Sequence, residues 1–183
     1  MENKSFKTTF APTIVLVIIC LVVTFALVMT NGATKPTIEK INKVNADLAR
    51  AEVLAKGDSF VEYTGKLNEG IEGYFSAKNK AGVAVTSTSK SFGGTMTVMV
   101  GIDADGAITG VKVTGHADTP GLGTKAMTPE YLKGYVGVNE LAVDNIKDDP
   151  KVDYIVGASV SSNGVYDAVQ GALQQFKDCG GVK

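Results

Sequence analysis

The chain begins with a long apolar run, and after it the spacing of apolar residues changes twice. No charged residue lies between Lys7 and Lys35, and the segment from Ala11 to Thr30 is almost wholly apolar. A helix of this length spans about 30 Å, the hydrocarbon thickness of a bilayer. The run exceeds the apolar part of a signal peptide, and Asn31-Gly-Ala33 is a poor cleavage site. We predict a retained transmembrane helix at residues 11–31 after a short tail, residues 1–10.

Apolar residues next recur at helical spacing, with charged residues between them. Pro36 is expected to interrupt the chain and Thr37 to cap a new helix. The apolar positions of that helix are Ile38, Ile41, Val44, Leu48, Ala51 and Ala55. They predict a stalk or linker helix within residues 32–59. Basic residues flank both ends of the transmembrane run, so charge counting does not decide its orientation.

From Tyr74 onward the pattern alternates, as in strands. We predict strands at Tyr74–Lys78, Val83–Thr86, Thr95–Ile102 and Ile108–Gly115, with a turn at Asp103–Gly106. A short helix is expected at Pro129–Tyr135. A final helix carries an apolar stripe from Val165 to Phe176, with Ser161 or Ser162 as its N-cap. Residues 60–183 are therefore predicted to form an α+β domain with a mainly antiparallel sheet flanked by helices.

The composition of the chain restricts the partners and cofactors that it can bind. The net charge is −1 and no basic stripe is present, which excludes a nucleic-acid partner on electrostatic grounds. The chain has two cysteines and one histidine, too few for a structural zinc site or an iron–sulfur cluster. We predict no metal site, so any redox chemistry requires an organic cofactor.

Two segments could carry chemistry. The loop from His116 to Lys125 concentrates hydroxyls, glycines and charged groups directly after a strand, which suits contact with a ligand. The tripeptide Gly157-Ala-Ser159 precedes the last helix. It can be a plain helix cap or a phosphate site at the helix N-terminus. A third alternative is a serine esterase, with Ser159 as the nucleophile and His116 as the base.

Three motifs together resemble a known family. Asp153-x-x-Val-Gly-Ala-Ser159 is similar to the flavinylation motif D-x-x-[S/T]-G-A-[T/S] of FMN-binding domains. His116-x-Asp-Thr-Pro-Gly-Leu-Gly-Thr-Lys125 resembles the family's H-x-E-T-P-G-L-G loop, and Ser91-Phe-Gly-Gly-Thr95 its G-Y-G-G segment. The nearest subfamily is the G subunit of the Rnf ion-translocating ferredoxin:NAD oxidoreductase complex. The C subunit of the sodium-pumping NADH:quinone reductase and a stand-alone extracytoplasmic flavoprotein are the alternatives.

The resemblance implies a function and a place in the cell. The chain would be an electron-transfer component, not catalytic alone, of a membrane complex that couples ferredoxin:NAD electron transfer to Na⁺ or H⁺ translocation. Its N-terminus would be cytoplasmic and its flavin domain extracytoplasmic on a single-pass anchor. Its partners would be the other subunits, including one with a second covalent FMN, and a flavin transferase during maturation.

The resemblance also implies the site. Ser159 would carry FMN through a phosphoester, and Asp153 would be recognised by the transferase. The residues expected to contact the cofactor are Asp118, Thr119, Leu122, Gly123, Lys125, Gly157, Ala158 and Phe92.

Overall fold

The computed structural model describes residues 2–141 and 143–182, with side chains from residue 10 onward. The chain divides into two compact units, Met1–Asn45 and Ala46–Lys183. The first unit is helical, and the second contains the end of the first helix, a five-stranded sheet and the remaining helices.

The first helix, α1, runs from Glu2 to Val53 without interruption. It is long and apolar enough to cross a membrane, and none of its most apolar window is buried, unlike the core helix of a soluble protein. The predicted break at Pro36 is wrong, because this proline lies inside the helix. One proline removes a single backbone hydrogen bond at a cost of about 3 kcal/mol. The helical turns on both sides keep their own bonds and continue through it.

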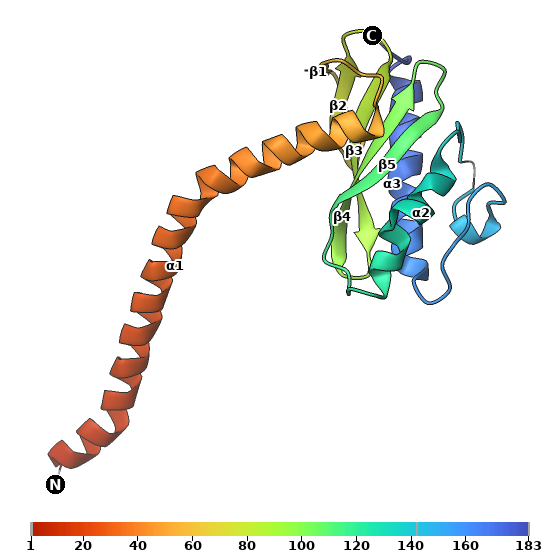
Figure 1. The fold of residues 1–183 in the computed structure, drawn as a ribbon. Helices are drawn as coiled ribbons and strands as arrows, with labels where there is room; N and C mark the ends of the chain where they lie inside the picture. The colour runs from red at the N-terminus through yellow and green to blue at the C-terminus, as the bar shows by residue number, and fades with distance from the viewer. Residues whose placement is uncertain (1, 142, 183) are drawn as a thin grey trace. The chain divides into compact units, whose positions relative to one another are not determined.

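The sheet is an antiparallel meander in the order β1-β2-β3-β4-β5 (Figure 1). Its strands are Phe60–Glu62, Ile71–Ala77, Gly82–Ser91, Gly94–Asp103 and Ile108–Gly115. The four predicted strands are confirmed as β2 to β5, and β3 is longer than expected. The sequence missed β1, which is too short to show an alternating pattern. At Asp103–Gly106 the predicted turn is confirmed, with the Asp103 carboxylate accepting from two backbone N–H groups.

The register of β3 and β4 places a two-residue turn at one end of the sheet. The strands pair continuously from Gly82 opposite Asp103 to Ser91 opposite Gly94. Phe92 and Gly93 therefore form the connection, and the Phe92 side chain is 73% exposed there. This hairpin end forms one side of the site described below.

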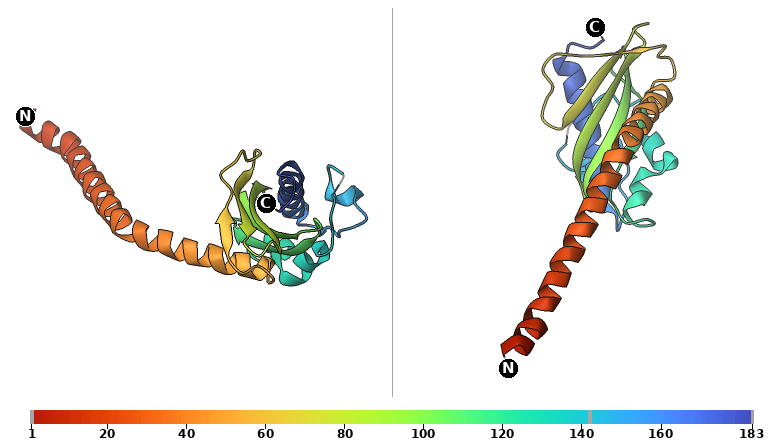
Figure 2. Two further views of the ribbon diagram at one scale, coloured as in Figure 1. Left: turned by 90° about the horizontal axis from the view of Figure 1, so that it is seen from above. Right: turned by 90° about the vertical axis from the view of Figure 1, so that its left-hand side faces the viewer.

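The two faces of the sheet are covered by different helices (Figures 1 and 2). Because alternate residues of a strand face opposite sides, Val83 and Val85 pack into the main core with α3, which spans Ser159–Asp178. Ala84, between them, packs on the other face with Val53 at the end of α1. The predicted last helix is confirmed, and it ends before Gly180 as expected.

The start of α3 differs from the prediction. The helix begins at Ser159, and its N-cap is Ala158, which provides no side-chain hydrogen bond. Ser161 and Ser162 are not caps, because both side chains bond to segments outside the helix: Ser161 Oγ donates to Asp118, and Ser162 Oγ accepts from the Ile155 N–H. Tertiary contacts have taken the hydroxyls that the sequence offered for capping.

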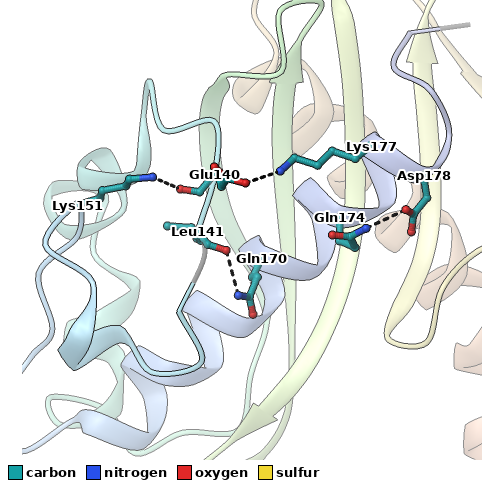
Figure 3. Close-up of polar contacts among 7 residues, drawn as sticks. All are labelled: Glu140, Leu141, Lys151, Gln170, Gln174, Lys177 and Asp178. Atoms are coloured by element: carbon teal, nitrogen blue, oxygen red, sulfur yellow. Dashed lines mark hydrogen bonds and ion pairs between the residues drawn. The ribbon is translucent and has the colours of Figure 1, made fainter.

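Short helices connect the sheet to α3. They are η1 (Gly123–Met127), α2 (Pro129–Leu132), η2 (Lys133–Tyr135) and η3 (Ile146–Asp148). The helix predicted at Pro129–Tyr135 is present as one α turn followed by a 3₁₀ turn. Polar contacts hold the segment after η2 along α3 (Figure 3). Lys177 pairs with the Glu140 carboxylate at 3.0 Å, and Gln170 donates to the Leu141 carbonyl at 3.0 Å.

Candidate functional site

A hollow of about 240 Å³ lies at the start of α3. Three segments that are distant in sequence form its walls: the β3–β4 turn, the loop after β5, and the beginning of the helix. Its lining residues are Phe92, Thr119, Leu122, Gly123, Gly157, Ala158, Ser159, Val160 and Ser161.

The helix supplies the polar end of the hollow. The first N–H groups of any α-helix have no intrahelical partner, and here the cap residue Ala158 has no side chain to accept from them. The first turn of this 20-residue helix contains no acidic residue of its own. Free N–H donors and the positive end of the helix dipole together favour a bound phosphate.

Small residues keep the approach to this helix end open. Gly157 has φ +84°, a left-handed conformation that favours glycine. A Cβ placed on Gly157 would meet no atom within 4 Å, so the space beside it is free. Ser159 follows as the first residue of the helix, half-buried, in the lining of the hollow. Its hydroxyl is thus positioned to meet a group bound at the helix N-terminus.

The opposite side of the hollow is apolar and exposed. Leu122 and Val160 are 49% and 51% exposed, in addition to the exposed ring of Phe92. Large apolar side chains that line a hollow yet face solvent are typical of a surface that a ligand covers. The combination of a phosphate end and an apolar rim suits an anionic ligand with a flat aromatic part.

Behind the hollow, the Asp118 carboxylate is buried, and both of its oxygens accept hydrogen bonds. Oδ2 accepts from Ser91 Oγ and from Ser161 Oγ, both at 2.5 Å, and Oδ1 accepts from the Gly93 N–H at 2.6 Å. Burial acts to raise the pKa of Asp118, but these three hydrogen bonds and the nearby His116 outweigh it and hold the pKa below its ordinary value. The carboxylate is therefore ionised at neutral pH.

Two glycines allow the walls to approach this carboxylate. A Cβ on Gly123 would lie 2.7 Å from Asp118 Oδ2 and 2.8 Å from Ser161 Oγ. A Cβ on Gly93 would lie 2.1 Å from the Ala117 carbonyl oxygen. Any larger residue at either position would push the loop away from the helix or from the hairpin.

The structure brings together most of the residues that the sequence singles out. Seven of them line the hollow, namely Phe92, Thr119, Leu122, Gly123, Gly157, Ala158 and Ser159. Asp118 is not in the lining, because it is turned inward to its three donors. Lys125 is exposed on η1 and also lies outside the lining. Asp153 is exposed in the segment that precedes α3.

Sequence reasoning missed three residues of this region. Ser161 and Val160 line the hollow, and Ser91 bonds to Asp118. Ser91 belongs to one of the quoted motifs and Ser161 follows another by two positions, but nothing local distinguishes the first from a turn residue or the second from a cap. Only the fold shows that both hydroxyls converge on one carboxylate.

Comparison with known proteins identifies the class to which this fold and site belong. Residues 91–174, which contain all three walls of the hollow, match the FMN-binding domain family. The G subunit of the Na⁺-translocating ferredoxin:NAD⁺ oxidoreductase complex of Acetobacterium woodii is 30% identical, over 97% of this chain and 99% of that protein. The G subunit of the ion-translocating oxidoreductase complex of Methanosarcina acetivorans is 28% identical, over 87% of this chain and 90% of that protein.

The chain belongs to the family of G subunits of ion-translocating oxidoreductase complexes. Among solved structures, NqrC of Shewanella oneidensis is similar with a TM-score of 0.47 and 21% identity, over 63% of this chain and 65% of that chain.

Proposed function

We propose that this protein is the membrane-anchored flavoprotein subunit that carries FMN and relays electrons within an ion-translocating ferredoxin:NAD oxidoreductase complex. The observation that carries the proposal is the position of Ser159, at the first residue of an uncapped 20-residue helix and in the lining of an apolar-rimmed hollow. Membership of the G-subunit family supports the same function.

The residues of the hollow fit FMN. The N–H groups at the start of α3 suit its phosphate, and the open space at Gly157 admits that phosphate beside the helix. Phe92, Leu122 and Val160 suit its ring system. When bound, FMN supplies redox chemistry that protein side chains lack. The hollow is smaller than the roughly 300–1,000 Å³ typical of ligand pockets, so part of the cofactor would remain open to a redox partner.

We infer a covalent attachment at Ser159. The new bond joins Ser159 Oγ to the FMN phosphorus, and the bond that breaks is the phosphoanhydride of a flavin dinucleotide donor. The nucleotide leaves as its monophosphate and the hydroxyl proton is released. A flavin transferase would carry out this step and recognise the exposed Asp153 carboxylate in the preceding segment. Lys125 would add positive charge near the phosphate only if its flexible side chain turns toward the hollow.

The apolar helix and the family support a proposal for where the domain works. A helix able to cross a membrane precedes the flavin domain in the chain, and the relatives are subunits of ion-translocating complexes. We propose a cytoplasmic N-terminus, a single membrane pass and an extracytoplasmic flavin domain. Its partners would be the other subunits of the complex, including one with a second covalent FMN.

The attachment is tested by expressing the full chain in a host that contains a flavin transferase. We expect a band on a denaturing gel that fluoresces under ultraviolet light, and a Ser159 peptide heavier by FMN less water. Ser159→Ala should abolish both signals, whereas Ser159→Thr should retain them because threonine keeps an alcohol at this position. Thr119→Ala, which removes another hydroxyl from the lining, is the matched control and should stay fluorescent.

A dark wild-type band from such a host would contradict covalent attachment. A fluorescent band with no integral-membrane partners upon purification in mild detergent would instead favour a stand-alone flavoprotein. Co-purification with subunits of a sodium-pumping NADH:quinone reductase would favour the other alternative.

A further inference from the structure

The three walls of the hollow meet on one side chain. Ser91 ends β3, Gly93 lies in the β3–β4 turn, and Ser161 lies in the first turn of α3. Each donates one hydrogen bond to Asp118, which belongs to the loop that supplies Thr119, Leu122 and Gly123 to the hollow. The hairpin end, the loop and the helix start are distant in sequence, so the carboxylate joins parts of the hollow that the backbone leaves separate.

The Asp118 carboxylate and its three donors form a buried junction between the walls of the hollow. Asp118 is 4% exposed, and its three donors are two hydroxyls and one backbone N–H. Hydrogen bonds to an ionised acceptor are shorter and stronger than neutral ones, and they are lost together when a buried acceptor is removed. Ser91 and Ser161 are themselves buried, so neither hydroxyl has bulk water as an alternative acceptor.

Asp118 also contacts the first turn of α3, where a ligand would bind. Hydroxyls near a helix start tend to accept from the free N–H groups there. Here the Ser161 hydroxyl is directed to Asp118 at 2.5 Å, and α3 has no side-chain cap. The Ser161 contact therefore fixes the loop to the first turn of a helix whose first N–H groups have no side-chain cap.

We propose that Asp118 is the positioning residue of the FMN site, which holds the hairpin end, the 119–123 loop and the start of α3 at the spacing that the cofactor needs. This inference rests on the proposed function. It assigns to Asp118 no contact with the flavin. Its effect on the cofactor passes through Ser161 and Gly123, and the close packing of Gly123 on the Asp118 side chain transmits it to the loop.

The test compares five full-length proteins in detergent: wild type, Asp118→Ala, Ser91→Ala, the double variant Asp118→Ala/Ser91→Ala and the control Asp105→Ala. Ser91→Ala removes a single hydrogen bond from a residue outside the lining, so it keeps the test valid if Asp118→Ala folds poorly. Asp105 is an exposed turn residue remote from these donors in the hydrogen-bond pattern.

The first measurement is hydrogen exchange, which needs no flavin. We expect faster exchange at residues 92–94, 119–123 and 159–162 in Asp118→Ala and Ser91→Ala, with the centre of β3 and β4 unchanged. The double variant should exchange no faster than Asp118→Ala alone, because both changes break the same junction. The proposal would be overturned if exchange became uniformly faster across the sheet, or if exchange at the three walls of the hollow stayed at the wild-type rate.

The second measurement is made on the FMN-loaded proteins. Asp118→Ala and Ser91→Ala should lower the flavin fluorescence anisotropy and raise the iodide quenching constant about twofold or more, because walls that have lost a hydrogen bond to a charged group hold the flavin less firmly. Asp105→Ala should match wild type. A flavin signal equal to wild type in both variants would overturn the proposal even if their stability fell. A wild type without flavin would refute the proposed function instead, and the exchange data would still decide the role of Asp118.

Discussion

At the scale of single residues, Asp118 and Ser159 occupy different parts of the site. Ser159 lies half-buried in the hollow, whereas Asp118 lies behind it with both carboxylate oxygens occupied. A buried charge is normally costly. Here three donors compensate for its burial, and this compensation has a consequence for stability as a function of pH.

The domain should lose stability at acid pH through Asp118. Its pKa is lower in the folded protein than in the unfolded chain, so its contribution is fully present above the unfolded pKa of about 3.9. That contribution is lost as pH falls through the folded pKa. Asp118→Asn should therefore destabilise the domain by about 1–3 kcal/mol at pH 7, and the difference from wild type should shrink below pH 4.

The measurement is urea unfolding between pH 7 and pH 3, followed by tyrosine circular dichroism. All six tyrosines lie between Tyr63 and Tyr166, so the signal reports on the domain and not on the membrane helix. Glu140→Gln is the matched control, because Glu140 also has a lowered pKa, caused by Lys177, but lies on the surface of the domain. A difference between wild type and Asp118→Asn that stays constant down to pH 3 would contradict this account.

The residues of the site are predictable where a backbone property or a motif fixes them. Gly157, Ala158 and Ser159 can be found from sequence because small residues before a hydroxyl at a helix start suit phosphate. The inward turn of Asp118 cannot, because it depends on two serines 27 and 43 positions away that have no sequence link to it. Spacing along the chain carries no information about which hydroxyls meet in space.

At the scale of elements, the end of α1 is packed on the sheet with unusual closeness. Val53 packs with Ala84 and Met99, and Thr109 Oγ1 donates to the Val53 carbonyl at 2.5 Å. A Cβ on Gly101 would lie 2.1 Å from that same carbonyl oxygen. The helix end can come this close to the sheet because this strand position and Gly110, which also faces Val53, have no side chain.

Gly101→Ala should therefore displace the end of α1. The overpacking is expected to destabilise the domain by about 1–3 kcal/mol, and amides near residues 49–54 should exchange faster with solvent. Gly115→Ala is the control, since a Cβ there would meet Thr97 at an ordinary 3.6 Å. Unfolding and hydrogen exchange measured on both variants check this. Equal behaviour of the two alanine variants would show that the contact is adaptable.

The elements themselves are largely predictable, because strand alternation and helical stripes reflect burial directly. The errors lie where tertiary structure overrides a local signal. Pro36 favours a break in a helix that in fact continues, and Ser161 is a good cap residue in a helix that begins before it. The contact of Val53 with the sheet gives no signal, because a glycine in a strand does not reveal which element approaches it.

At the scale of the whole molecule, the boundary between anchor and domain lies inside one helix. The compact unit that contains the sheet begins at Ala46, although α1 continues unbroken across that point. Ala49, Val53 and Leu54 are all at most 2% exposed within this unit. The segment between Ala46 and Gly57, predicted from sequence as part of a stalk, thus contributes to the core of the flavin domain.

Truncation of the chain tests this boundary. Residues 46–183 should fold without detergent, because the apolar run that ends at Thr30 is absent, and should keep a urea midpoint close to that of the full chain. Residues 60–183 lose the buried Val53 and Leu54, at about 1.5–3 kcal/mol each, and also expose the Ala84 and Met99 face of the sheet. Since a domain is stable by only about 5–15 kcal/mol, this loss should lower the midpoint strongly.

An intermediate fragment, residues 54–183, retains Leu54, and its urea midpoint should fall between those of the other two fragments. Equal midpoints for all three fragments would show that the end of α1 is a linker, and the flavin domain would then begin at β1.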